Sequence, residues 1–273
     1  MRTYENKDEL KNETNKVKII FFDIDGTLLE MGKTEITPNM RKALCSLKQN
    51  GIKICIATGR PFVTIPMFEG IVFDAILAFN GSFCVAGDQV VAKCPIPKED
   101  VKKIIENAKR MERPVSIATA EEIVANGSDK DLEDYFALAH HGVNVSEKFE
   151  EYVEKDVFQI MLGCDLEERK YILKGTKNAK LAAWWDRAID IIPKEGGKGT
   201  AIEQVLAHYK FSKEEAIAFG DGENDMDMLL SVGKGIAMGN AAEKVKEIAA
   251  DICESVTDDG IYYYLKSQKL INE

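Results

Sequence analysis

Two aspartates, Asp23 and Asp25, stand at the end of an apolar run, residues 17–22 (VKIIFF). Side chains two positions apart share a face in extended backbone, so both carboxylates can reach one site. That site would lie at the carboxyl edge of a parallel sheet, where open α/β folds bind ligands. Gly26 and Thr27 follow directly and predict a tight turn that offers backbone amides and a hydroxyl. This turn favours a binding site over the alternative, a solvated pair of acids at a strand end.

A second acidic cluster follows another short apolar run, residues 216–220 (AIAFG), and contains Asp221, Asn224 and Asp225. Carboxylates gathered at two strand ends would repel one another strongly without a cation. A hard, oxygen-liganded ion such as Mg²⁺ resolves that repulsion. A calcium-binding EF-hand loop does not fit, because Met226 stands where that loop requires glycine. The two clusters together therefore predict a magnesium site.

Groups that could bind a phosphoryl group occur at two further places. Lys198 lies in the glycine-rich segment GGKGT just before a predicted helix, where a lysine and a helix N-terminus together attract anions. It is not the lysine of a P-loop, because Gly199 takes the place of the required Ser or Thr. Thr58, Gly59 and Arg60 follow a third short apolar run. Each segment alone is a weak signal, since ordinary turns contain the same residues.

Short strands of a parallel sheet must hold these groups. Residues 17–22, 52–57 and 216–220 are apolar, rich in β-branched or aromatic side chains and bounded by turn formers, as buried parallel strands are. Between the first two, residues 37–51 predict a helix that begins with a capping Thr37 followed by proline. Strand, helix and strand in this order predict a right-handed βαβ unit.

The middle of the chain differs in character. Over residues 84–189, strand-like pieces alternate with charged helical stretches, and no comparable polar cluster occurs. The predicted fold class is therefore α/β, with a core formed by residues 17–83 and 190–273 and an inserted α+β domain of residues 84–189. Residues 1–16 are polar and densely charged, and we expect them to be an extension that precedes the fold.

Composition limits the partners. The 273 residues carry a formal net charge of −10, which argues against nucleic acid but still permits a small anion beside a bound cation. No apolar run approaches the roughly 18–20 residues of a membrane span, and the N-terminus lacks the apolar core of a signal peptide. The six cysteines are scattered without a C-x-x-C pair, as expected of reduced thiols in a cytoplasmic protein.

Four segments in chain order, DIDGT, ATGR, GGKGTA and GDGENDMDML, carry a specific resemblance. The sequence resembles the haloacid dehalogenase-like hydrolases over roughly residues 17–265, and within them the Cof-type subgroup, in which an α/β cap is inserted between the second and third motifs. Residues 79–81 (FNG), 235–241 and 256–261 reinforce it. The resemblance implies a Rossmann-like, doubly wound parallel sheet as the core and residues 84–189 as a cap that selects the substrate.

The resemblance also implies a role for each acid. Asp23 would be the nucleophile that accepts the phosphoryl group, and Asp25 would be the general acid for the leaving alkoxide and then the base for the hydrolytic water. Mg²⁺ would be bound by Asp23, Asp221 and the backbone carbonyl of Asp25. Asp225 and Thr27 would support the site. An acid two positions after the nucleophile is the phosphatase and phosphomutase pattern within this family.

Phosphate contacts are implied in the same way. Thr58 and the backbone amides of Gly59 and Arg60 would hold phosphate oxygens, Lys198 would neutralise developing charge, and Asn224 would point towards the phosphate. The implied function is a magnesium-dependent phosphatase that acts on a small phosphorylated metabolite, as a monomer or small homo-oligomer. A phosphomutase or phosphotransferase of the same fold and a non-catalytic sensor of phosphorylated metabolites are the alternatives. The pairs His140–His141 and Trp184–Trp185 fall in the expected cap, where packing or substrate contact could explain them.

Overall fold

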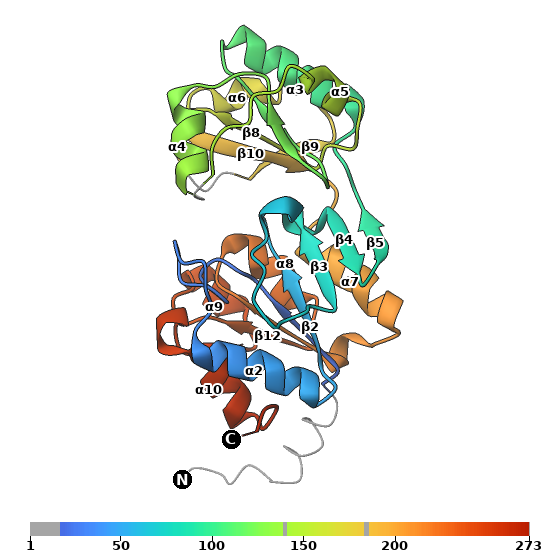
Figure 1. Ribbon diagram of the computed structural model, residues 1–273, viewed down its shortest axis with the longest axis vertical. Coiled ribbons are helices and arrows are strands. Elements are labelled where there is room, and N and C mark those ends of the chain that lie inside the picture. Colours follow the sequence, from blue (N-terminus) through green and yellow to red (C-terminus); the bar gives the residue numbers. More distant parts are fainter. Residues whose placement is uncertain (1–16, 139–140, 183–185, 273) are drawn as a thin grey trace. The chain divides into compact units, whose positions relative to one another are not determined.

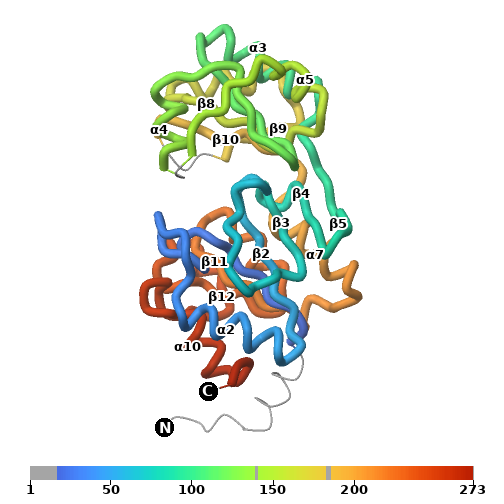
Figure 2. Tube along the Cα trace, viewed as in Figure 1, coloured from blue at the N-terminus to red at the C-terminus, as the bar shows by residue number. Residues whose placement is uncertain are grey.

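The computed structural model describes residues 17–138, 141–182 and 186–272, which form two compact units (Figures 1 and 2). The first unit contains residues 17–59, 66–92 and 197–272, and the second contains residues 60–65 and 93–196. Each unit has its own β-sheet. The expected extension, residues 1–16, lies outside the described residues, as do His140 and Trp184–Trp185.

The first unit is built on a sheet of eight described strands in the order β13-β12-β11-β1-β2-β3-β4-β5. Its strands are β1 (Ile19–Phe22), β2 (Lys53–Ala57), β3 (Ala75–Ala78), β4 (Phe83–Ala86), β5 (Gln89–Lys93), β11 (Ala216–Gly220), β12 (Lys234–Ala237) and β13 (Asp251–Ile252).

The three strands predicted from the sequence are neighbours in this sheet. β1 pairs in parallel with β11 on one side and with β2 on the other, so that Phe22 lies opposite both Phe219 and Ile56. Every residue of β1 is fully buried. The carboxyl ends of β2, β1 and β11 therefore meet at one edge of the sheet, and the predicted α/β fold class is confirmed.

Helices flank this sheet (Figure 1). The described helices of the first unit are α2 (Pro38–Gln49), α7 (Lys198–Tyr209), α8 (Met226–Leu230), α9 (Glu243–Ile248) and α10 (Gly260–Ser267). α2 packs against α10, and α7 packs against α8. α2 begins as predicted, because the Thr37 hydroxyl accepts a hydrogen bond from the Met40 amide at 3.0 Å.

The second unit has an antiparallel sheet of five described strands in the order β7-β6-β8-β10-β9. These strands are β6 (Ser116–Ala118), β7 (Ile123–Ala125), β8 (Gln159–Gly163), β9 (Ala179–Ala182) and β10 (Ala188–Pro193). Its described helices are α3 (Lys98–Arg110), α4 (Lys130–Leu138), α5 (Phe149–Val153) and α6 (Arg169–Ile172). One core joins side chains from the sheet and from α3, α5 and α6.

The chain passes into the second unit near residue 93 and leaves it near residue 196, and residues 60–65 also belong to that unit. Hydrogen bonding accounts for the positions near 93 and 196. β4 pairs antiparallel with β3 and so extends the first sheet, whereas β10 pairs with β8 and β9 in the second. Neither strand carries a sequence signal that assigns it to one sheet rather than the other.

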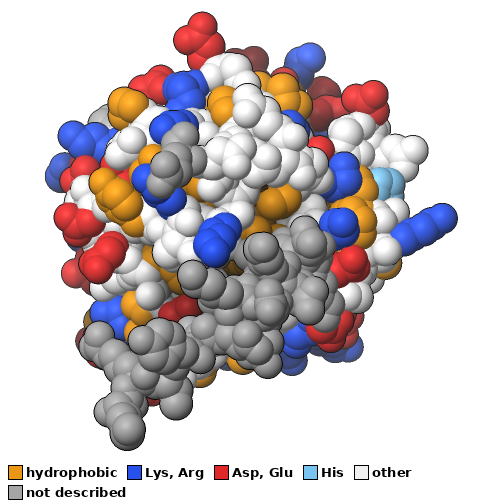
Figure 3. All heavy atoms as spheres, turned by 90° about the horizontal axis from the view of Figure 1, so that it is seen from below, with side chains coloured by type: hydrophobic (Ala, Val, Ile, Leu, Met, Phe, Trp, Pro, Cys, Tyr) orange, Lys and Arg blue, Asp and Glu red, His pale blue; other side chains and the backbone are white. Residues whose placement is uncertain are grey.

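The described surface carries charges of both signs. On the face drawn in Figure 3, Lys and Arg side chains are interspersed with Asp and Glu side chains. His141, the described member of its pair, is exposed. Within residues 17–138, 141–182 and 186–272, no helix has the length and apolar character that crossing a membrane requires.

The contact between α8 and β12 is close enough to require glycine. A Cβ atom on Gly235 in β12 would lie 2.2 Å from the carbonyl oxygen of Leu229 in α8. Because Leu229 presents backbone here, the crowding cannot be relieved by moving a side chain.

We therefore expect Gly235→Ala to lower the free energy of unfolding by about 2–3 kcal/mol. Gly142→Ala is the matched control, because a Cβ on Gly142 would meet nothing within 4 Å. Denaturant unfolding of both variants, followed by circular dichroism, provides the measurement. Equal stability of the two variants would contradict the packing described here.

Candidate active site

The edge of the first sheet gathers the two acidic clusters. Asp23 directly follows β1 and donates its backbone amide to the carbonyl of Phe219 at 3.0 Å, so it remains in register with β11. Asp221 directly follows β11. Asp23 is 6% exposed and Asp221 is half-buried. Residues 198 positions apart in the sequence thus come together because their strands are neighbours.

A buried ion cluster lies beside them. Lys198, the first residue of α7, is fully buried. Its Nζ atom lies 2.6 Å from Asp23 Oδ1 and 2.5 Å from Asp225 Oδ1. Burial disfavours the charged ammonium, but the attraction of Asp225 and Asp23 outweighs burial and raises the pKa of Lys198 above its usual value. The lysine is therefore a permanent cation between two buried carboxylates.

Asp225 organises the loop after β11. Its Oδ2 atom accepts hydrogen bonds from the backbone amides of Asp221 and Gly222, both at 2.9 Å. Its Oδ1 atom accepts from Lys198. Both oxygens thus have strong donors, and this carboxylate fixes the loop and the lysine at the same time.

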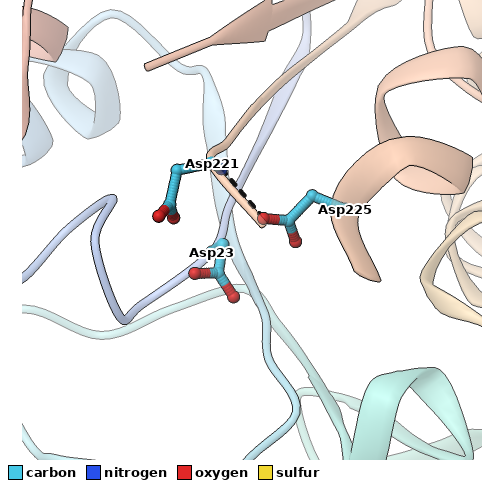
Figure 4. A group of neighbouring side chains, drawn as sticks. All are labelled: Asp23, Asp221 and Asp225. Carbon is cyan, nitrogen blue, oxygen red and sulfur yellow. Dashed lines mark hydrogen bonds between the residues drawn. The ribbon is translucent and has the colours of Figure 1, made fainter. Parts of the chain in front are cut away.

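The carboxylates form a group that could hold a metal ion. One oxygen from each of Asp23, Asp221 and Asp225 lies within 4.8 Å of the others, and the three side chains converge from β1 and the loop after β11 (Figure 4). A donor set made only of oxygen suits Mg²⁺.

The pKa values of Asp23 and Asp221 are both raised, which is consistent with a site that a cation could occupy. Burial and the charge of Asp225 raise the pKa of Asp23 well above its usual range, against the opposing effect of Lys198. Burial, followed by Asp225, also raises the pKa of Asp221 to about 6, although the Thr27 hydroxyl and Lys198 act in the other direction. A bound dication would lower both pKa values.

The turn after Asp23 is built around Asp221. The Thr27 hydroxyl donates to Asp221 Oδ1 at 2.9 Å. Gly26 has φ +85°, and a Cβ there would lie 2.2 Å from Asp221 Oδ2, so only glycine fits. Asp25 lies on the same turn, half-buried, with a backbone bridge between it and Leu29.

The expected phosphate-binding residues divide into two groups. Thr58 is buried at the end of β2 and donates its amide to Leu77 O at 2.8 Å, and Gly59 follows it. The side chain of Asn224 donates to Asn80 Oδ1 at 3.0 Å. Arg60, in contrast, belongs to the second unit, where its guanidinium donates to the carbonyl of Thr64 at 3.4 Å.

Three residues of the site had no predicted role. Asn240 donates its side-chain amide to the Gly26 carbonyl at 2.9 Å, and Asp227 accepts from the Gly199 amide at 3.0 Å. Asn80 accepts a hydrogen bond from the side chain of Asn224. Asn80 and Asn240 lie in the segments 79–81 and 235–241, and Asp227 lies in the fourth motif, so a signal was present for each.

Comparison with known proteins identifies the family of this chain. The family model described as haloacid dehalogenase-like hydrolase matches residues 20–265. The chain belongs to this family. It is 34% identical to the Bacillus subtilis (strain 168) protein named "Putative phosphatase YkrA", over 93% of this chain and 98% of that one.

Two further relatives have more specific names. The 5-amino-6-(5-phospho-D-ribitylamino)uracil phosphatase YitU of Bacillus subtilis (strain 168) is 29% identical, over 92% of this chain and 97% of its own. The solved structure of the subclass IIB sugar phosphatase BT4131 matches with a TM-score of 0.81 and 30% identity, over 93% of this chain and all of that one. The predicted enzyme class is confirmed: the chain is a phosphatase of this family.

Removal of the buried ammonium should be costly. In Lys198→Met, two buried carboxylates would face each other uncompensated, and we expect the free energy of unfolding to fall by about 3–5 kcal/mol at neutral pH in EDTA. Because the pKa of Asp23 is already raised, protonation should relieve this repulsion, and the deficit should shrink between about pH 8 and about pH 5.

Denaturant unfolding at the two pH values measures this effect. Lys266→Met, at an exposed lysine of α10, is the matched control and should change stability by less than about 0.5 kcal/mol. A deficit for Lys198→Met that is as small as the control, or that does not change with pH, would count against the buried ion cluster.

Proposed function

We propose that this protein is a magnesium-dependent phosphatase that hydrolyses small phosphorylated metabolites through an aspartyl-phosphate on Asp23. The observation that carries the proposal is the buried Lys198 ammonium, held 2.6 Å from Asp23 and 2.5 Å from Asp225 beside a third carboxylate, Asp221. Phosphoryl transfer requires mainly positioning and electrostatic stabilisation, and this arrangement offers both.

In the first step, a carboxylate oxygen of Asp23 attacks phosphorus and the ester bond to the leaving group breaks. Asp25 gives a proton to the departing alkoxide. Lys198 offsets the charge that develops on the phosphoryl oxygens, and Thr58 and the Gly59 amide hold those oxygens in place. Asp23 then carries the phosphoryl group as a mixed anhydride.

In the second step, water attacks the phosphorus of the aspartyl-phosphate and the bond to Asp23 breaks. Asp25, now ionised, takes the proton of that water, so the same carboxyl serves as acid and then as base. Inorganic phosphate leaves, and Asp23 and Asp25 return to their starting states. Asn224, in the loop after β11, would orient the phosphate.

Mg²⁺ would be held by Asp23, Asp221 and the backbone carbonyl of Asp25, and it would supply positive charge to the phosphoryl oxygens. Both oxygens of Asp225 already accept hydrogen bonds from Lys198 or from backbone amides, which supports a role for Asp225 in shaping the site instead of binding the metal directly. Thr27 holds Asp221 in a similar supporting way.

We propose sugar phosphates and related phosphorylated polyols as the substrate class. The subclass IIB sugar phosphatase BT4131 and the ribityl-phosphate phosphatase YitU are relatives over most of this chain, and their named substrates share a phosphate on a polyhydroxylated carbon chain. The second unit would act as the cap that selects among them. The six free cysteines support a cytoplasmic location.

The first test is phosphate release from a panel of sugar phosphates and para-nitrophenyl phosphate. Asp23→Asn should lower the rate to background, because the amide is not a nucleophile, and chelation with EDTA should abolish activity until Mg²⁺ is restored. Asp88→Asn, at an exposed turn of the first unit, is the matched control and should keep wild-type activity. Metal-independent turnover, or an active Asp23→Asn variant, would refute the mechanism.

The second test traps the covalent intermediate. Asp25→Asn should slow hydrolysis of para-nitrophenyl phosphate about 10²–10⁴-fold, because water lacks its base, whereas attack by Asp23 on this good leaving group continues. Intact-protein mass spectrometry should then detect one added phosphoryl group. The double variant Asp23→Asn with Asp25→Asn should acquire none. An adduct on the double variant would place the nucleophile elsewhere.

The same assays separate the alternatives. A phosphomutase would release little phosphate and would require a bisphosphorylated sugar as activator, so isomerised sugar phosphate would accumulate instead. A sensor would bind members of the panel without turnover. We expect net phosphate release without an activator, because the relatives described above are named phosphatases.

A further inference from the structure

The chain makes an unusual turn after β3. Phe79, Asn80 and Gly81 have φ values of 51°, 53° and 84°, three consecutive left-handed residues of which only one is glycine. Phe79 is bulky and fully buried, and such a residue rarely adopts this conformation. Strained backbone of this kind persists only where its surroundings fix it, and it is concentrated at functional sites.

The turn contacts three segments that are far apart in the sequence. The Asn80 amide donates to the Thr58 carbonyl at 2.9 Å. Asn80 Oδ1 accepts from the side chain of Asn224 at 3.0 Å. A Cβ on Gly81 would lie only 2.4 Å from the Gly197 carbonyl, so the turn also touches the residue just before Lys198.

These three segments are the ones that the proposed mechanism assigns to the phosphate. Thr58 and Gly59 follow β2, Lys198 begins α7, and Asn224 lies in the loop after β11. The side chain of Asn80 also lies against Gly59, where an added Cβ would approach the amide of Asn80 to 3.2 Å. One left-handed turn therefore fixes the spacing between otherwise separate phosphate-binding groups.

We propose that Asn80 is a positioning residue that acts on phosphoryl transfer through Asn224 and the Thr58–Gly59 backbone. This inference rests on the proposed function. The left-handed backbone of Asn80 brings its side chain to the loop after β11. There, Asn80 Oδ1 accepts a hydrogen bond from the side-chain amide of Asn224. Asparagine suits the position because it is one of the few residues besides glycine that adopt the left-handed conformation, and its side-chain oxygen can accept a hydrogen bond from Asn224.

The contrasting hypothesis is that Asn80 serves only to form the turn. Glycine adopts the left-handed conformation without cost, so Asn80→Gly keeps the turn and removes only the amide. If Asn80 acts through Asn224, the variants Asn80→Gly and Asn224→Ala break the same hydrogen bond. Their effects should then overlap in the double variant.

The experiment is a double-mutant cycle with para-nitrophenyl phosphate and Mg²⁺. We expect Asn80→Gly to lower kcat/KM about 10- to 100-fold, mainly through kcat, because misplacement of the phosphate contacts by about 1 Å can cost 10²-fold. The kcat/KM of the double variant should be no more than a few-fold below that of the less active single variant. Lys210→Gly is the matched control, since Lys210 has φ +59° at the exposed end of α7, and it should keep wild-type kinetics.

Each outcome decides the inference. Losses that multiply in the double variant, or full activity in Asn80→Gly, would overturn it, because either result makes the hydrogen bond to Asn224 irrelevant to catalysis. Thermal unfolding of Asn80→Gly should stay close to that of Lys210→Gly, and a large drop instead would assign Asn80 to stability alone. Wild-type turnover that disappears in Asp23→Asn upholds the proposed function whatever the cycle gives, so the two failures are distinguishable.

Discussion

The site depends on one buried interaction, the ammonium of Lys198 between the carboxylates of Asp23 and Asp225. Each of the three charges would be costly to bury alone, and removal of one partner leaves the others uncompensated. The cluster therefore forms only when the end of β1, the start of α7 and the loop after β11 are all in place. The first unit therefore assembles this ion cluster as it folds.

The parallel sheet provides the geometry that this cluster requires. Adjacent parallel strands present their carboxyl ends at one edge, so loops distant in sequence meet without long connections. Close approach then decides which residues fit between the loops. Gly26 lies against Asp221 and Gly81 against Gly197, and a single Cβ at either position would collide. The polar side chains are thus held by backbone that has almost no free space.

Sequence predicted the parts of this site that depend on local pattern. Short apolar runs located β1, β2 and β11, and the acids after two of them indicated the edge of the sheet where the carboxylates gather. Asn80 and Asn240 received no role, because their function depends on which loops they approach in the folded chain. The sheet to which a short strand belongs depends on pairing in the same way. β4 looks like any short strand, and only its antiparallel pairing with β3 assigns it to the first sheet.

The connection that returns from the second unit ends at Gly197, one residue before Lys198. Gly197 lies against Gly81 on one side and Asp227 on the other, both of them residues of the first unit. The boundary between residues 196 and 197 therefore marks where a segment of the second unit could be exchanged for that of a relative. An exchange of residues 93–196, the larger segment of the second unit, would retain the lysine on its own scaffold, whereas a graft that extended into Gly197 would import a foreign backbone into the ion cluster. Changes in the second unit could thus accumulate while the acid–lysine cluster stays unchanged.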